Sequence, residues 1–233
     1  MKRFSEIITS PDYDSSRTRS IVREKHELST ECKPVPEDWE RLEDTVQLLF
    51  NTMVERQGIG LSANQININR KVCVVNVNEP FYLVNPEIID HDGMTPYVES
   101  CLSFPDETLK TKRHVRVTVQ ADNFEQPLQF GPSKSEWDNS EDIDIDHPDM
   151  LECVAVQHEI DHLNGITFHQ RRIGFQKPYI NTRDIGRNDK VVVRNKNDVT
   201  ETKTLKFKHA NRLGDEWQIL GTANTVDKIE INL

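Results

Sequence analysis

Apolar residues recur at helical spacing in two parts of the chain. The first part runs from Pro36 to Gly58, where acidic residues in the first turn and one apolar stripe predict an amphipathic helix packed on the core. The stripe consists of Trp39, Leu42, Val46, Leu49 and Met53. We expect this helix to end at Gly58, because glycine commonly follows the last helical turn.

The second helical part, from Pro148 to Gly165, is apolar on nearly every side. Proline is tolerated in a first helical turn and glycine often follows the last, so we expect a helix of about four turns. Its apolar residues form two stripes, one shared with two histidines. They are Leu151, Val154 and Ala155, and Val156, Ile160 and Leu163. A helix of this composition is expected to be buried.

Strand-like segments lie between and after these helices. Residues 72–77, 82–89 and 114–120 are rich in β-branched and aromatic residues, and the last alternates valines with polar residues, which is typical of a strand with one solvated face. Residues 99–105 are loop-like. After Arg172, three short strands are predicted between Asn, Asp and Gly turns. They are residues 190–194, 202–208 and 216–220.

The buried helix contains the sequence Gln157-His158-Glu159-Ile160-Asp161-His162. His158 and His162 lie one turn apart on the same face, so both imidazoles can bind one metal ion. Glu159 points about 100° around the helix, which suits a general base better than a third ligand. The alternative is a hydrogen-bonded pair of core histidines, but a metal supplies the partners that buried imidazoles need. The motif indicates a metal-dependent hydrolase.

Cys101 is the leading candidate for a third ligand, because thiolate and imidazole are typical zinc donors. A lone cysteine is more often a small buried apolar residue. The four cysteines are too few and too scattered for a disulfide framework, so we expect reduced thiols. The glycine-rich stretch Gly58–Gln65 is, taken alone, best interpreted as a turn after a helix.

Composition excludes several classes of protein. The 233 residues suffice for one domain with an appendage or for two small domains. A net charge of -10 argues against general nucleic-acid binding. No signal-peptide pattern and no apolar run near ~20 residues is found, so we expect a soluble cytoplasmic protein without membrane contact.

Charge is unevenly distributed along the chain. Residues 131–149 hold seven acidic residues and one lysine, and the spacing is not that of a calcium loop, so a solvated acidic insertion is expected. Residues 183–212 hold nine Lys or Arg and four acidic residues, a balance of +5. This basic segment is either the solvated face of a small β-rich module or a docking surface for RNA or a membrane.

Three stretches in this order resemble the signature motifs of peptide deformylases. Gly58–Gln65 is similar to the glycine-rich first motif, Glu99–Ser103 to the Glu-Gly-Cys-Leu-Ser second motif, and Gln157–Gly165 to the histidine motif. The resemblance covers about residues 35–172. Two residues differ from it: Ser100 stands where the family usually has Gly, and Asn64 where Pro is common. We expect Ser100 to alter substrate affinity and to leave metal binding intact.

The resemblance implies the fold and the domains. We expect an α+β fold, with antiparallel and mixed β-sheets packed around a central buried helix that carries the histidine motif. Residues 1–172 would form the catalytic domain and residues 173–233 a small β-rich C-terminal extension.

The resemblance also implies the activity: removal of the N-formyl group from the formylmethionine of nascent polypeptides, with release of formate. Cys101, His158 and His162 would bind one divalent metal, which is Fe(II) in typical members, with Zn, Ni or Co accepted. Glu159 would act as general base. Gln65 and the Leu102 N–H would stabilise the charge that develops on the carbonyl oxygen. The remaining positions form the pocket for methionine: Ile59, Gly60, Leu151 and Val154.

Two alternatives remain at this point. One is a zincin-type metallopeptidase, which needs a third ligand downstream of the helix, where neither His169 nor His209 lies in a recognisable frame. The other is a catalytically weak, ribosome-associated homologue that binds metal. For the deformylase interpretation, the expected partners are N-formylmethionyl nascent peptides and, through the basic segment, the ribosome, with no DNA and no membrane. The location would be the bacterial cytoplasm, or the cytoplasm of a bacterial host if the source is viral.

Overall fold

The computed structural model describes residues 3–133 and 147–173 in full and, after Ile173, the backbone of six short strands. The chain divides into two compact units, residues 1–173 and 174–233. The acidic insertion falls mostly outside the described residues. So do the side chains of the basic segment.

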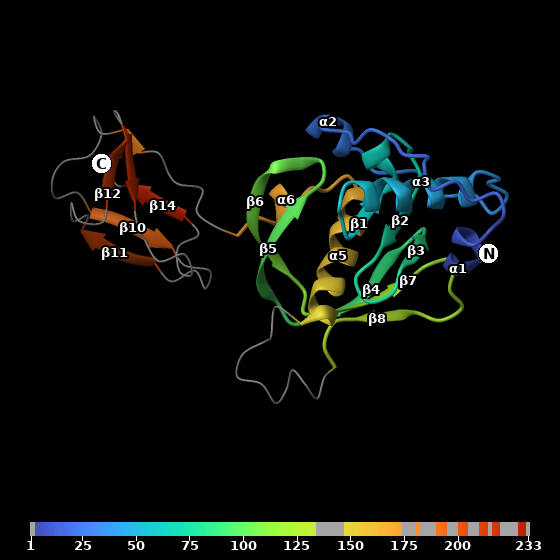
Figure 1. Cartoon of the computed structure of the whole chain (residues 1–233). Coiled ribbons are helices and arrows are strands. Elements are labelled where there is room, and N and C mark those ends of the chain that lie inside the picture. The colour runs from blue at the N-terminus through green and yellow to red at the C-terminus, as the bar shows by residue number, and fades with distance from the viewer. Residues whose placement is uncertain are drawn as a thin grey trace. The chain divides into compact units, whose positions relative to one another are not determined.

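The first unit has an α+β fold built from small antiparallel sheets (Figure 1). Its helices are α1 (Phe4–Ile8), α2 (Lys25–Leu28), α3 (Leu42–Glu55), the 3-10 turn η1 (Ala63–Ile66), α5 (Pro148–Leu163) and α6 (Phe168–Arg171). Its strands are β1 (Gly60–Ser62), β2 (Val72–Val75), β3 (Phe81–Val84), β4 (Glu87–Asp92), β5 (Thr95–Cys101), β6 (Phe104–Arg113), β7 (Arg116–Gln120) and β8 (Leu128–Phe130). They form the sheets β1-β2-β3 and β4-β7-β8 and the hairpin β5-β6.

The β1-β2-β3 sheet is buried on both faces, which explains the unbroken apolar run in β2. Val72 and Val74 belong to the core cluster that contains the apolar stripe of α3. Cys73 and Val75 point to the other face and pack with α5. Figure 1 shows α5 beside β1 and β2, with which it is in contact. A strand covered on both sides needs no polar face.

The helix α5 begins at Pro148 and ends at Leu163, as predicted. Twelve of its sixteen residues are buried, so the helix that is apolar on nearly every side lies in the core. Gly165 follows the C-cap with φ 71°, and a Cβ there would lie 2.9 Å from the backbone of Ser29 and Glu31. The glycine is therefore required where the chain turns away from the helix.

Several element predictions need correction. The predicted helix from Pro36 begins only at Leu42, because residues 36–41 form turns, and the left-handed residue after it is Gln57 (φ 57°), not Gly58. The predicted strand 82–89 is broken at Asn85 (φ 49°) into β3 and β4, which belong to different sheets. The sheets were expected to be partly mixed, yet every described strand pair is antiparallel.

Residues 99–105 were expected to form a loop and instead include the end of the β5–β6 hairpin. Cys101 is the last residue of β5, next to a shift in strand register between Ser100 and Cys101. Most residues of β6 are polar and exposed, because only one face of the strand is covered. Its sequence therefore does not predict a strand.

The second unit is described through its strand backbones. Two three-stranded antiparallel sheets have the orders β11-β10-β14 and β12-β13-β9. The strands are β9 (Ile180–Asn181), β10 (Lys190–Arg194), β11 (Thr200–Thr204), β12 (Ala210–Leu213), β13 (Glu216–Ile219) and β14 (Lys228–Ile231). The predicted strands at 190–194 and 216–220 are confirmed. The third begins at residue 200 instead of 202, and the sequence reading missed β9, β12 and β14.

Among the described residues, no helix is long and apolar enough to cross a membrane.

Candidate metal centre

Cys101, His158 and His162 converge in the core of the first unit. The Sγ of Cys101 lies 3.3 Å from Nε2 of His162, and the Nε2 atoms of His158 and His162 are 3.1 Å apart. All three ligand atoms lie within 4.8 Å of one another, and all three side chains are buried. The structure thus brings together the three residues that the sequence proposed as ligands.

The donor set fits a single divalent metal ion. Tetrahedral bonds of about 2.1 Å to nitrogen and about 2.3 Å to sulfur would separate two nitrogens by roughly 3.4 Å and nitrogen from sulfur by roughly 3.6 Å. The observed separations are a few tenths of an ångström shorter. Each imidazole presents the same ring atom, Nε2, to this point, so a cation placed there would be shared by three lone pairs.

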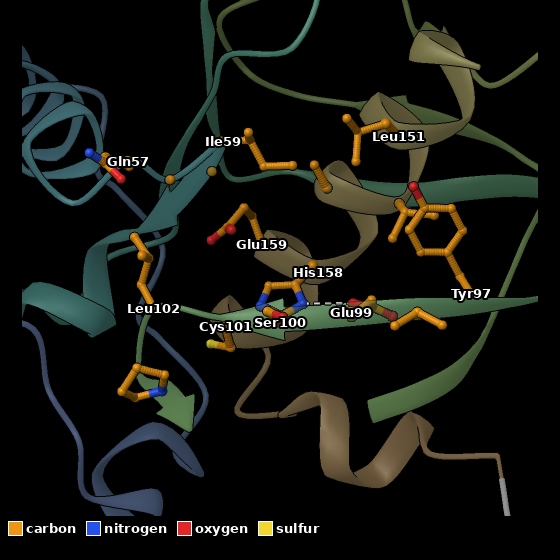
Figure 2. Close-up of a pocket in the computed structure, with 16 residues that line it drawn as sticks. Gln57, Ile59, Tyr97, Glu99, Ser100, Cys101, Leu102, Leu151, His158 and Glu159 are labelled. Carbon is orange, nitrogen blue, oxygen red and sulfur yellow. Dashed lines mark hydrogen bonds and ion pairs between the residues drawn. The ribbon is translucent and has the colours of Figure 1, made fainter. Parts of the chain in front are cut away.

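Glu99 fixes the orientation of the first histidine. Its Oε2 lies 2.8 Å from Nδ1 of His158, which leaves Nε2 directed toward the other two candidate ligands, Cys101 and His162 (Figure 2). Burial alone would raise the pKa of Glu99, but hydrogen bonds from His158 and Arg113 overcome this and lower the pKa to about 2. An ionised carboxylate on the far side of a ligand imidazole fixes its tautomer and makes it a better donor.

Arg113 joins Glu99 to a second buried carboxylate. Its Nε and Nη2 lie 2.6 and 2.9 Å from the two oxygens of Glu99, and its Nη1 lies 2.5 Å from Oδ2 of Asp161. Asp161 also accepts from Arg171, at 3.0 and 2.6 Å. Thr111 adds a hydroxyl contact to Glu99. This paired network ties β5, β6, α5 and α6 together around the donors.

Glu159 lies beside the cluster and is itself buried. Its Oε2 has no hydrogen-bond partner among the described residues, and burial raises the pKa of this carboxyl group to about 7. Figure 2 shows its side chain between Ile59 and His158. A buried carboxyl with a pKa near neutrality can both take up and release a proton, as general acid–base catalysis requires.

Gln65 lies on the other side of Cys101. Its Nε2 is 3.6 Å from Cys101 Sγ and donates to Ser103 Oγ at 3.2 Å, while its Oε1 accepts from the Ser62 N–H at 3.0 Å. The amide is thus held with its N–H groups toward the cluster. Leu102 follows Cys101 directly and lines the same cleft.

A cleft of about 390 Å³ opens over these groups. It is lined by all four residues predicted for the methionine pocket: Ile59, Gly60, Leu151 and Val154. The structure adds Tyr97, Val98 and Ala155 to this apolar lining. Figure 2 shows Tyr97 and Leu151 at the same end of the cleft.

Ser100 does not point toward the donors. Burial alternates along β5, with Glu99 and Cys101 buried and Ser100 exposed between them. Its hydroxyl lies 3.2 Å from the hydroxyl of Thr108, its direct partner on β6. The side chain that differs from the usual glycine therefore stands on the opposite face of the strand from Cys101, and it still lines the cleft, as Val98 does.

Sequence reasoning assigned no role to Glu99, Arg113, Asp161 or Tyr97. Glu99 and Asp161 were visible as carboxylates within the second and third motifs. Arg113 carried no signal, because nothing in a polar strand marks one arginine as buried. Tyr97 lies in a hairpin that the sequence did not reveal.

An α+β protein with a buried thiol, two imidazoles and an adjacent buried carboxyl at the floor of an apolar cleft has the features of a metal-dependent hydrolase. Comparisons with known proteins agree. Residues 19–177 match the sequence profile described as polypeptide deformylase. The chain belongs to the polypeptide deformylase family, whose members are metal-dependent hydrolases that deformylate nascent peptides.

The alignments with individual relatives include most of each relative's length. Peptide deformylase of Heliobacterium modesticaldum is 41% identical over 152 residues, which are 65% of this chain and 87% of that protein. A Met-Ala-Ser-bound peptide deformylase from Acinetobacter baumannii is 26% identical with a TM-score of 0.54, covering 66% of this chain and 98% of that one. A Synechococcus elongatus peptide deformylase in complex with actinonin is 27% identical with a TM-score of 0.55, covering 70% and 80%.

Proposed function

We propose that this cleft removes the formyl group from N-formylmethionyl peptides. The observation that carries the proposal is the convergence of Cys101, His158 and His162 next to the buried carboxyl of Glu159, at the floor of an apolar cleft. The helix α5 would be the central catalytic helix, and residues 1–172 the catalytic domain. A neighbouring structure of the family binds the peptide Met-Ala-Ser, which supports a peptide as the substrate.

Cys101, His158 and His162 would hold one divalent metal ion. When bound, such an ion lowers the pKa of water toward neutrality and draws charge from a carbonyl oxygen. A thiolate with two imidazoles suits iron, zinc, nickel and cobalt, and we propose Fe(II) because typical members of the family use it. Glu99 would keep Nδ1 of His158 protonated, so that the lone pair of Nε2 stays available to bind the metal.

Glu159 would carry the proton. Its carboxylate would take a proton from the attacking water and pass it to the departing amine nitrogen, so that formate leaves and a free N-terminus remains. The pKa of about 7 suits both steps, because neither form of the group is strongly disfavoured near neutrality.

Gln65 and Leu102 would stabilise the charge on the carbonyl oxygen. The Gln65 amide is held from its oxygen side by Ser62, so its N–H groups are already oriented when substrate arrives. We assign the backbone N–H of Leu102 as the second donor. Loss of one such donor typically costs about 3 kcal/mol in the transition state.

The methionine side chain would occupy the apolar end of the cleft. Ile59, Leu151 and Val154 form this end together with Tyr97. An unbranched thioether adapts to such a pocket and makes favourable contacts with an aromatic ring.

A formate-release assay tests the proposal. The full-length chain, loaded anaerobically with Fe(II) or Ni(II), is expected to release formate from formyl-Met-Ala-Ser. Glu159→Ala is expected to abolish release while the metal content stays at that of the parent chain. Cleavage of internal peptide bonds without formate release would instead favour a zincin-type peptidase. Metal binding with neither activity would favour a catalytically weak homologue.

We further propose that the enzyme works in the bacterial cytoplasm and docks on the ribosome through the basic segment 183–212. The support is the local charge balance of +5, which suits a phosphate backbone. Ribosome co-sedimentation should decrease when the chain is ended at Ile173 and should also decrease with added salt. Unchanged co-sedimentation of the shortened chain would remove this proposal.

A further inference from the structure

Asn64 connects the 3-10 turn that carries Gln65 to the helix that carries His162. Its Nδ2 donates to the backbone oxygen of His162 at 2.6 Å, and its Oδ1 lies 3.0 Å from the hydroxyl of Ser62. The side chain is buried, with 9% of its surface exposed. Proline, which is common at this position in peptide deformylases, can make neither contact.

The chemistry of the two partners fixes which way the amide points. The His162 carbonyl can only accept, so the NH₂ group of Asn64 must face it. The oxygen of Asn64 then faces the Ser62 hydroxyl, which can donate. Both contacts are satisfied in one orientation only, so Asn64 is held in a single conformation.

The carbonyl that Asn64 binds belongs to the last turn of α5, where carbonyls have no helical N–H partner. His162 O also accepts from the Gly165 N–H at 3.1 Å. Because this oxygen is part of a metal-ligand residue, the bond from Asn64 restrains the position of the His162 imidazole relative to η1.

The other end of the connection reaches Gln65. Ser62 Oγ lies 2.9 Å from Gln65 Oε1, and the Gln65 amide nitrogen faces Cys101 and Ser103. The Ser62 hydroxyl has one hydrogen, which faces both amide oxygens, and the Ser62 N–H donates separately to Gln65 Oε1 at 3.0 Å. A chain of polar contacts therefore runs from the His162 backbone through Asn64, Ser62 and Gln65 to the thiol of Cys101.

We propose that Asn64 is a positioning residue that holds the His162 end of α5 against the Gln65 turn, and so sets both metal retention and the placement of the Gln65 amide. The inference rests on the proposed function, since it takes His162 as a ligand and Gln65 as an oxyanion donor. It assigns a task to a residue at which this chain departs from the common family pattern.

The chain offers a matched control in Asn123. Its amide makes two hydrogen bonds to backbone atoms of β3, donating to Tyr82 O at 2.8 Å and accepting from Val84 N at 3.0 Å, away from the proposed metal ligands. Loss of either asparagine should lower stability. Loss of Asn64 alone should change the metal site.

The experiment compares the full-length chain with Asn64→Ala, Asn64→Asp and Asn123→Ala, each loaded with Co(II). The measurements are the visible Co(II) spectrum, the rate at which EDTA removes the metal, and kcat and KM for formyl-Met-Ala-Ser. Both Asn64 variants should lose metal on the order of tenfold faster, as is typical when a partner of a ligand is removed. Their spectrum should change, and kcat should decrease with KM close to that of the parent chain. Asn64→Asp keeps the shape of the side chain but lacks the N–H donor. It therefore still tests the inference if Asn64→Ala does not fold.

Two results would overturn the inference: folded Asn64 variants with the parent spectrum and metal-release rate, or an equal acceleration of metal release by Asn123→Ala. Absence of formate release from the parent chain would reject the proposed function. The spectrum and the release rate would still decide the role of Asn64.

Discussion

Gly60 has no side chain, and the Glu159 carboxylate occupies the space where one would stand. A Cβ at Gly60 would lie 2.6 Å from Oε1 of Glu159 and 3.0 Å from its Cγ. We predict that Gly60→Ala displaces the carboxylate and lowers kcat for formate release by about 10²-fold, the low end of what a positioned general base contributes. Metal content should be unchanged.

The matched control is Gly58→Ala, where the added methyl would meet the end of the Leu102 side chain at 2.7 Å and not the carboxylate. A Leu102 terminal methyl can move more easily than a buried carboxyl group. If Gly60→Ala retained full kcat, Glu159 could not be acting from the position seen here.

Ser100 was expected to alter substrate affinity, and the structure places it among the residues that line the cleft. Its hydroxyl is on the exposed face of β5 and pairs with Thr108. Ser100→Gly should leave metal affinity and kcat unchanged and reduce the free energy of unfolding by roughly 0.5–1 kcal/mol, as glycine does within a strand. Urea unfolding and steady-state kinetics test this, and a more than tenfold change in KM would show that the side chain contacts substrate.

The four cysteines should differ sharply in reactivity. Burial raises the pKa of Cys32 to about 11, that of Cys153 to about 12, and that of Cys73 well above its ordinary value. Near neutral pH these three remain protonated and unreactive. After removal of metal by a chelator, Cys101, which lines the cleft, should be alkylated first, and added Zn(II) or Ni(II) should protect it. Mass spectrometry of the labelled peptides measures this, and equal labelling with and without metal would contradict the ligand assignment.

At the scale of elements, the helices and the most apolar strands could be predicted from sequence, whereas the hairpin that completes the site could not. The helix α5 has capping residues at both ends and an apolar surface that only burial explains. The strands β5 and β6 have a buried face made of charged and polar residues, among them Glu99, Thr111 and Arg113. Their burial depends on pairing with each other and with α5, and no local pattern records a contact between residues so distant in sequence.

The same logic limits what could be said of the site. His158, His162 and Glu159 lie within one helical turn, so their geometry follows from the helix. Cys101 was proposed from ligand chemistry as well as from the resemblance, whereas Gln65 came from the resemblance alone. The structure places Cys101 next to His162 and Gln65 next to Cys101. Glu99 contacts His158 directly, and Arg113 links Glu99 to Asp161, but the sequence assigned no role to these three residues.

Arg113 should be the most costly single residue to remove from this arrangement. Its side chain is 2% exposed and is the shared partner of two buried carboxylates on β5 and α5. Arg113→Leu would remove the guanidinium that both carboxylates share. Breaking a buried ion pair in this way typically lowers the free energy of unfolding by about 3–5 kcal/mol. Urea unfolding of the metal-free chain measures the loss. Arg17→Leu is the control, because its pair with Asp44 is largely exposed and should contribute under about 1 kcal/mol.

At the scale of the whole molecule, every residue assigned to the proposed site lies in the first unit, and so do the contacts that close it. After α6, the Ile173 N–H donates to Lys110 O at 2.7 Å and Arg172 forms a β-bridge with Thr111. These contacts anchor the end of the unit to β6, the strand that holds Arg113. A shortened chain should therefore end at Ile173 and no earlier.

We predict that residues 1–173 fold alone, bind metal and release formate from formyl-Met-Ala-Ser with kcat and KM within about twofold of the full-length chain, because every residue assigned to the proposed site lies within them. A chain that ends at Gln170 lacks Arg171 and the two anchoring contacts, so Asp161 loses one of its two arginines. That chain should unfold at lower urea concentration and lose metal faster. Loss of activity already at Ile173, with the fold and metal content intact, would show that residues 174–233 take part in catalysis and are more than an appended module.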